Sequence, residues 1–397
     1  MQYFHAQYSN HPADDGESEF FGLKAADASL AFHRTVPGYE ATKLVDLKAL
    51  AAHLGVKQLF VKDESTRFGL NSFKGLGGSR CVADVMSRQL GLDPEHPDFE
   101  LLTRRSREAA SPITFCTATD GNHGRGIAWS AKAMGQKCVV WLPAGSAPER
   151  VENIRALGAE THVSDLNYDR TVEKARALAA ENGWVFVQDT DDEKSSETVR
   201  LLMQGYLTMA EEIRLAIPQV PTHVFLQAGV GSFAGAMAAF FSTIWKETAP
   251  EIIVVEAEKA DCIMDTARAN DGAIHSSTGD LETIMAGLSC GTPCRLAWKL
   301  LKRHAEHFVS LPDEAAARAM RILGNPLPGD RAIVSGESGA AGVGALVELM
   351  TCPAAEAARR EIGLDENSVV LCISTEGDTD KANYRRIVWD GAWPSSC

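Results

Sequence analysis

The chain has 397 residues, of which 45% are hydrophobic and 23% charged, as is usual for a globular protein. With 39 basic and 53 acidic side chains, the formal net charge is -14, which repels phosphate backbones and excludes nucleic acid as an expected partner. No run of about 18 apolar residues is present, so no membrane partner is expected, and the first residues lack the pattern of a secretory signal. The length favours two domains.

The nine cysteines are scattered along the chain from Cys81 to Cys397. An odd number without regular spacing is typical of reduced thiols, so we expect free cysteines and a cytoplasmic protein. Cys290 and Cys294 form the closest pair, but no second pair or histidine cluster follows them, so no metal site is expected.

Apolar runs typical of strands alternate with amphipathic stretches typical of helices. Strands are predicted at 57–64, 111–119, 137–143, 159–164, 184–189, 222–228, 251–258 and 368–377, and helices at 147–158, 168–183, 196–217 and 233–247. This alternation indicates an α/β protein with parallel sheets covered by helices. Such folds bind ligands at the carboxyl ends of their strands, so the turns that follow strands are the places to search.

The first turn of interest is "RFGLNSFKGLGG", residues 67–78, which contains Lys74. Glycines allow a backbone to approach a ligand closely. A lysine desolvated by neighbours such as Phe73 and Leu76 becomes a nucleophilic amine, and such lysines form Schiff bases with aldehydes. The alternative is a solvated surface lysine.

A second turn, "QAGVGSFAG" at residues 227–235, joins a strand to a helix. Its glycines and the amides of a helix N-terminus form a cradle for a phosphate group, contributed by Gly229, Val230, Gly231 and Ser232. Two alternatives stay open: a dinucleotide site completed by Glu256 at the end of the next strand, or a turn that only lets the helix pack. Pyridoxal 5'-phosphate, with one aldehyde and one phosphate, would account for both this turn and Lys74.

The third turn, "TATDGNHGRGIAW" at residues 117–129, holds three polar side chains in close succession. Asn122 is suited to bind a cofactor hydroxyl, and Asp120 to accept a proton from a substrate. His123 is expected to orient a neighbour. Alternatively, Asp120 and Asn122 satisfy only the backbone of their own turn.

These three motifs and "VVWLPAGSAPERVENIRALGAE", residues 139–160, occur in the order found in the β-family of pyridoxal-phosphate enzymes, the tryptophan-synthase-like enzymes. Within it the chain is most similar to the diaminopropionate ammonia-lyases, over roughly residues 39–383. The resemblance implies two open, twisted α/β domains with the cofactor in the cleft between them. Residues 1–110 and 205–397 would form the large cofactor-binding domain and residues 111–204 the small one. A homodimer is also implied.

By this resemblance, Lys74 corresponds to the lysine that holds the cofactor as a Schiff base. Asn122 corresponds to the asparagine that contacts the cofactor's 3-hydroxyl group, and residues 229–232 to the phosphate loop. Thr375, in "ISTEGD", corresponds to a hydroxyl residue placed against the pyridine nitrogen. A neutral partner there suits elimination chemistry.

The resemblance also implies a substrate, a small amino acid. Asp120 replaces the small residue that dehydratases usually carry before "GNH", and it would take the α-proton of the D isomer while Lys74 serves the L isomer. Asp189, in "VFVQDT", corresponds to an active-site aspartate that would hold the substrate's β-ammonium group; alternatively it caps the following helix. The implied reaction is elimination of ammonia from 2,3-diaminopropionate, which yields pyruvate and two ammonia.

One segment departs from the family's pattern. After Asp189 and Thr190, the diaminopropionate enzymes carry an aromatic residue and a Gly-Tyr step, whereas this chain continues with "DDEKSSETVRLL". A β-substituted relative of diaminopropionate is therefore an alternative substrate. Three further alternatives are a dehydratase of serine, threonine or hydroxyaspartate, a nicotinamide-dependent oxidoreductase that uses Glu256, and a ligand-binding regulator.

Overall fold

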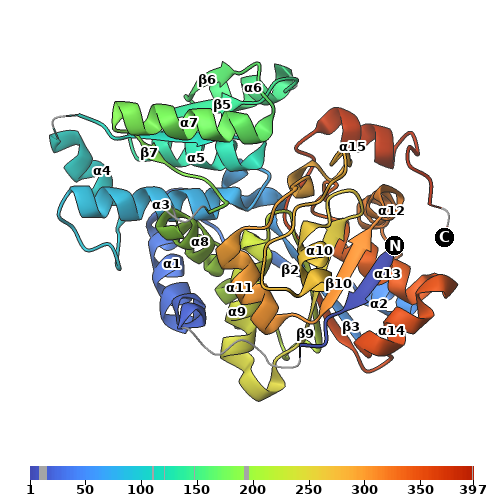
Figure 1. Cartoon of the computed structure of the whole chain (residues 1–397). Helices are drawn as coiled ribbons and strands as arrows, with labels where there is room; N and C mark the ends of the chain where they lie inside the picture. The colour runs from blue at the N-terminus through green and yellow to red at the C-terminus, as the bar shows by residue number, and fades with distance from the viewer. Residues whose placement is uncertain (9–15, 110, 120, 147, 192–195, 396) are drawn as a thin grey trace. The chain divides into compact units, whose positions relative to one another are not determined.

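The computed structural model describes residues 1–8, 16–109, 111–119, 121–146, 148–191, 196–395 and 397 (Figure 1). The chain forms two compact units. The first contains Met1–Leu23, Ala41–Ser72 and Met209–Cys397, and the second contains Lys24–Glu40 and Phe73–Thr208. These units differ from the expected boundaries in that residues 24–40, 73–110 and 205–208 group with the second unit.

The first unit is built on a seven-stranded sheet. Its order is β1 (Gln2–His5), β10 (His307–Leu311), β9 (Glu251–Ala257), β8 (His223–Gln227), β11 (Val369–Ser374), β3 (Gln58–Asp63) and β2 (Lys43–Asp46). The five inner strands are parallel, as predicted, whereas β1 and β2 are antiparallel edge strands. The sequence analysis assigned no strand at β1, β2 or β10. Both edge strands are short and only partly buried, so they lack the apolar run that marks an inner strand.

Helices cover this sheet (Figure 1). α2 (Lys48–Leu54), α12 (Asp313–Gly324), α13 (Ala341–Thr351) and α14 (Glu356–Ile362) share one apolar cluster with the sheet residues Phe225, Ile253, Val255 and Val309. α9 (Ser232–Trp245) packs against β8, and α11 (Arg295–His304) packs against α9. α10 (Cys262–Ala269) follows β9, and α15 (Lys381–Val388) packs against α12. The inner strands of this sheet are therefore supported by packed helices.

A buried network of charges holds the segment that follows β3. Lys62 Nζ donates to Glu212 Oε2 at 2.5 Å and to the carbonyl oxygen of Thr42 at 2.7 Å. Arg67 Nη1 donates to Glu212 Oε1 at 2.8 Å, and its Nε donates to Glu64 Oε2 at 2.8 Å. Burial alone would raise the pKa of Glu212, but Arg67 and Lys62 lower it, so the carboxylate stays ionised. The positive charges of Lys62 and Arg67 thus balance the negative charges of Glu64 and Glu212 in the protein interior.

The second unit is built on a four-stranded parallel sheet. Its order is β6 (Glu160–Val163), β5 (Lys137–Leu142), β4 (Thr114–Ala118) and β7 (Val185–Phe186), and all four strands were predicted. α7 (Tyr168–Asn182) covers the face that carries Cys116 and Val139. α5 (Asn122–Ala133) covers the other face, where Val140 lies against Gly124. The remaining helices are α1 (Leu23–Thr35), α3 (Lys74–Gln89), α4 (Phe99–Glu108), α6 (Pro148–Arg155) and α8 (Ser196–Ala216), the last of which continues into the first unit.

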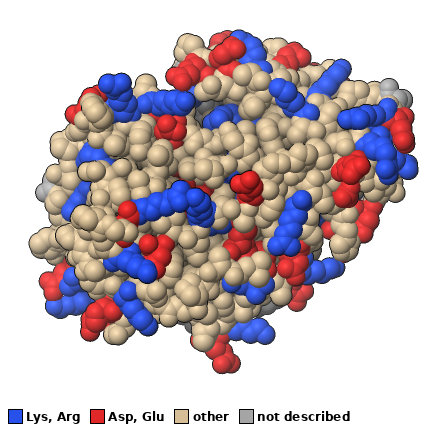
Figure 2. Space-filling model, turned by 180° about the vertical axis from the view of Figure 1, so that it is seen from behind, with Lys and Arg blue, Asp and Glu red and all other residues tan. Residues whose placement is uncertain are grey.

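Two further expectations concern the cysteines and the surface. Cys352, at the end of α13, forms a disulfide with Cys397, so the expectation of free thiols is wrong for this pair; the other seven cysteines form no disulfide. On the face shown in Figure 2, basic and acidic side chains alternate over the surface. Among the described residues, no helix combines the length and the apolar character needed to cross a bilayer.

Candidate active site

Lys74 is the first residue of α3 in the second unit. Its Nζ lies 2.8 Å from Asp189 Oδ2, and the lysine side chain is 20% exposed. The rings of Phe73 and Tyr206 lie 5.3 and 5.8 Å from the same nitrogen. The amine is therefore partly desolvated by aromatic surface, as predicted, but it also has a carboxylate as a counterion.

Asp189 follows β7 and is nearly buried. Burial alone would raise the pKa of its carboxyl group, but the adjacent charge of Lys74 lowers it well below its usual range. His123 Nδ1 lies 3.8 Å from Asp189 Oδ2, and His123 Nε2 lies 3.2 Å from the carbonyl oxygen of Val187. Burial lowers the pKa of His123, so the ring is neutral at pH 7. Thr190 and Asp191 are not helical, so Asp189 does not cap the following helix.

The glycines beside Lys74 serve helix packing. A Cβ atom on Gly77 would lie 2.5 Å from Cε1 of Tyr206, and one on Gly78 would lie 2.8 Å from the carbonyl oxygen of Gly126. A Cβ atom on Gly126 would in turn lie 2.7 Å from the carbonyl oxygen of Lys74. The prediction that these glycines make room for a ligand is wrong for Gly77 and Gly78, because α5 and α8 occupy the space.

The turn before α5 is described only in part. Asn122 is the first residue of α5, and its Oδ1 accepts a hydrogen bond from Arg125 Nη1 at 3.2 Å. Asp120 lies outside the described residues. Its neighbour Gly121 donates its backbone N–H to Thr119 Oγ1 at 3.2 Å. The predicted roles of Asp120 and Asn122 stay predictions.

The glycine loop of the first unit lies between β8 and α9. Gly231 has a φ of +93°, a conformation that favours glycine, and as the N-cap of α9 it supplies no side-chain cap. A Cβ atom on Gly229 would lie 2.9 Å from Cys290 Sγ, so packing alone already requires glycine there. The N-terminus of this 14-residue helix, which follows a glycine without a capping side chain, is suited to a phosphate group.

Thr375 directly follows β11 at the carboxyl edge of the same sheet. Its Oγ1 accepts a hydrogen bond from Gln227 Nε2 at 3.0 Å. The sequence analysis did not single out Tyr206, because it fits the apolar pattern of its helix. It did not single out Gln227 either, because a polar residue at the end of a strand is common and carries no signal of its own.

Glu256 has a structural role that removes the dinucleotide alternative. Its two carboxylate oxygens accept the backbone N–H groups of Ile263 and Met264, both at 2.8 Å, at the start of α10. The side chain is completely buried, and burial raises its pKa. Glu256 therefore caps a helix and is not placed to bind a ribose hydroxyl.

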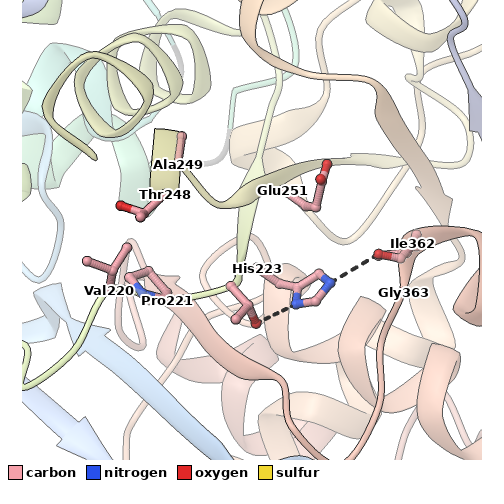
Figure 3. A pocket seen from close by; sticks show the side chains of 9 residues that line it. Val220, Pro221, His223, Thr248, Ala249, Glu251, Ile362 and Gly363 are labelled. Carbon is pink, nitrogen blue, oxygen red and sulfur yellow. Dashed lines mark hydrogen bonds between the residues drawn. The ribbon is translucent and has the colours of Figure 1, made fainter. Parts of the chain in front are cut away.

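A surface pocket of the first unit lies at the opposite ends of the strands (Figure 3). It is lined by Val220, Pro221, Thr222, His223, Thr248, Ala249, Glu251, Ile362 and Gly363. His223 and Glu251 are the first residues of β8 and β9. The two ring nitrogens of His223 are already bonded, to Thr222 Oγ1 at 2.7 Å and to the carbonyl oxygen of Ile362 at 3.1 Å. The pocket contains none of the predicted site residues.

The donor set fits pyridoxal 5'-phosphate. Lys74 supplies an amine beside aromatic rings, the start of α9 supplies a helix N-terminus after a glycine loop, and Thr375 supplies a neutral hydroxyl. Lys74 belongs to the second unit, and the other two groups belong to the first.

Known proteins match this chain over most of its length. The family described as "Pyridoxal-phosphate dependent enzyme" matches residues 36–375. Diaminopropionate ammonia-lyase of Escherichia coli (strain K12) is 44% identical over 380 residues, which cover 94% of each chain.

Two solved structures of the Escherichia coli enzyme are also similar. The crystal structure of its holo form has a TM-score of 0.90 and 41% identity, and covers 99% of this chain and 97% of that one. The complex with an aminoacrylate-PLP azomethine reaction intermediate has a TM-score of 0.88 and 40% identity, and covers 99% and 98%. The chain therefore belongs to the pyridoxal-phosphate-dependent enzymes of the tryptophan-synthase β-like fold, and its cofactor is pyridoxal 5'-phosphate.

Proposed function

We propose that the chain is a carbon–nitrogen lyase that eliminates ammonia from D- and L-2,3-diaminopropionate to give pyruvate and two ammonia. The observation that carries this substrate is the carboxylate of Asp189, 2.8 Å from Lys74 Nζ. Because its pKa is lowered, Asp189 is ionised at neutral pH and complements a second ammonium group on the substrate. The β-hydroxyl group of serine or threonine carries no charge for it to bind.

Each residue has a proposed task. When bound, pyridoxal 5'-phosphate withdraws electrons and makes the α-proton of an attached amino acid acidic. Lys74 accepts that proton from the L isomer, and Asp120 accepts it from the D isomer. Asp189 holds the β-amino group in its protonated form, which is the better leaving group.

Other residues hold the cofactor. Asn122 binds the 3-hydroxyl group, and the N-terminus of α9, with Gly229, Val230, Gly231 and Ser232, binds the phosphate. Thr375 faces the pyridine nitrogen. His123 is proposed to orient Asp189, because its neutral ring lies 3.8 Å from that carboxylate.

Release of pyruvate and ammonia from D- and L-diaminopropionate, measured beside serine and threonine, tests this function. We expect diaminopropionate to have the highest kcat/KM by at least about tenfold, because serine and threonine lack the charge that pairs with Asp189. Equal or better turnover of serine would replace the proposed substrate. The variant Asp120→Asn is expected to lose activity on the D isomer far more than on the L isomer; equal losses would contradict two separate bases.

A homodimer in the cytoplasm is proposed from the family resemblance. Light scattering of the purified protein tests the oligomeric state, and a monomer at micromolar concentration would contradict it. Fractionation of cells that produce the protein tests the compartment.

A further inference from the structure

Gln227 is a buried glutamine at the carboxyl end of β8, and its side chain is 2% exposed. β8 runs parallel to β11 with Cys372 opposite Phe225, so Gln227 lies beside the end of β11, from which Thr375 follows. Both residues belong to the first unit. The strand register therefore brings the amide of one to the hydroxyl of the other.

The chemistry of its neighbours sets the orientation of the Gln227 amide. Nε2 carries two protons, and four acceptors lie near it: the carbonyl oxygens of Ile373 at 2.7 Å, Ser338 at 3.2 Å and Gly339 at 3.4 Å, and Thr375 Oγ1 at 3.0 Å. The two shortest distances assign one proton to the Ile373 oxygen and the other to Thr375 Oγ1. Carbonyl oxygens only accept hydrogen bonds. A flipped amide would set its own oxygen against the Ile373 oxygen, so the nitrogen must face this cluster.

This arrangement assigns the proton of Thr375. A hydroxyl group has one proton to donate and two lone pairs to accept with, and one lone pair of Oγ1 already receives the Gln227 amide. The other amide proton goes to the oxygen of Ile373. Because Oγ1 accepts from the amide nitrogen, its own proton is directed away from that nitrogen and stays available for donation.

We propose that Gln227 is a positioning residue that holds the Thr375 hydroxyl as a hydrogen-bond donor to the pyridine nitrogen of the cofactor. This rests on the proposed role of Thr375. A nitrogen that accepts this hydrogen bond stays unprotonated, and the ring then withdraws electrons less strongly. Prompt loss of the β-amino group is thus favoured over return of a proton to the α-carbon, which would racemise the substrate.

Without Gln227 the Thr375 hydroxyl group can adopt a second hydrogen-bonding arrangement. The hydroxyl proton of Thr375 can then turn to the oxygen of Ile373 or Ser338. A lone pair of Oγ1 can in that case accept a hydrogen bond from a protonated pyridine nitrogen. The variant Gln227→Met keeps the length of the side chain and removes this amide. Gln136→Met is the matched control, because Gln136 is also buried and its Nε2 donates to Ser106 Oγ at 2.6 Å and to the carbonyl oxygen of Met134 at 2.7 Å.

The test measures the ¹⁵N resonance of pyridine-labelled cofactor bound to each protein between pH 6 and 9. In the wild type and Gln136→Met, we expect an unprotonated nitrogen throughout. In Gln227→Met, the resonance should move toward the protonated position as the pH falls, and racemisation per turnover should rise about fivefold, the value of one neutral hydrogen bond. Gln227→Asn, which keeps an amide but withdraws it by one methylene, serves if the Met variant does not fold.

Thr375→Val separates the two proposals. It should change the ¹⁵N resonance by itself, and adding Gln227→Met should then change nothing further, because the amide acts through the hydroxyl. If Thr375→Val changes the resonance and Gln227→Met does not, the role of Gln227 is overturned while that of Thr375 stands. If neither variant changes it, the role of Thr375 fails, and the role of Gln227 fails with it.

Discussion

Lys62 and Lys74 belong to one short sequence segment but have opposite surroundings. The side chain of Lys62 is 1% exposed and its Nζ donates to Glu212 and to the carbonyl oxygen of Thr42. The side chain of Lys74 is 20% exposed, and its Nζ faces Asp189 and lies beside two aromatic rings. A lysine in a fully buried ionic network stabilises the fold, whereas a lysine with solvent access and a nearby carboxylate is available for chemistry.

The largest expected effect comes from Lys74→Arg. Arginine keeps a positive charge beside Asp189, but its guanidinium group cannot form an imine. Activity should fall by about a thousandfold or more, while the urea midpoint changes little. Steady-state pyruvate release and borohydride fixation of the cofactor are the measurements. A variant that keeps a tenth of the activity would show that another amine, such as Lys62, carries the cofactor.

Lys62→Met tests the other lysine of this comparison, which is proposed to be structural. Removing one partner of a buried charge network costs about 3–5 kcal/mol of unfolding free energy, read from the urea transition. Activity per folded molecule should stay within about twofold, because the hydrogen bonds of Lys62 Nζ go to Glu212 and Thr42, which are not proposed site residues. The exposed Lys57→Met is the control and should lie within about 0.5 kcal/mol of the wild type. Equal unfolding free energies of Lys62→Met and Lys57→Met would contradict a structural role for Lys62.

Asp189→Asn should lower the stability of the cofactor-free protein by about 1–3 kcal/mol at pH 7, the value of a charge-assisted hydrogen bond. The pKa of Asp189 is lowered on folding, so this contribution is present above the unfolded value of about 3.9 and is lost as the pH falls below it. Urea transitions at pH 7 and pH 3.5 should therefore show a narrowing gap between wild type and variant. A gap that widens in acid would contradict the ion pair; exposed Asp390→Asn is the control.

Tyr206→Phe should have the smallest effect. Burial raises the pKa of Tyr206 to about 12, so the phenol is protonated at working pH and is not a base. The ring that faces Lys74 is retained, and we expect kcat/KM to change by less than about threefold. A loss of tenfold or more in kcat with unchanged stability would show that the hydroxyl takes part in proton transfer.

Local pattern predicted the inner strands of both sheets except β10. Their apolar runs reflect burial on both faces, which a strand between parallel neighbours always has. β1, β2 and β10 were not assigned. At the edges, pairing depends on a partner far along the chain, such as β10 for β1, and local sequence carries little of that information.

The glycines near Lys74 show where local reasoning misleads. The motif indicated close approach of the backbone to another group, which was correct, but for Gly77 and Gly78 the partners are Tyr206 and Gly126 of other helices. A ligand and a neighbouring helix place the same steric demand on a residue without a side chain. The identity of the partner depends on contacts between segments distant in the chain.

The sequence by itself determined the alternation of strands and helices and the order of the cofactor motifs, and it led to the proposal that Lys74 is the reactive amine. These follow from periodicity and from residue types that lie within one turn of each other. Only the tertiary structure decided that Asp189 is the counterion of Lys74, that Glu256 caps a helix and that Gln227 reaches Thr375. Hydrogen bonds and ion pairs act over about 3 Å, and it is folding that brings such distant residues within that range.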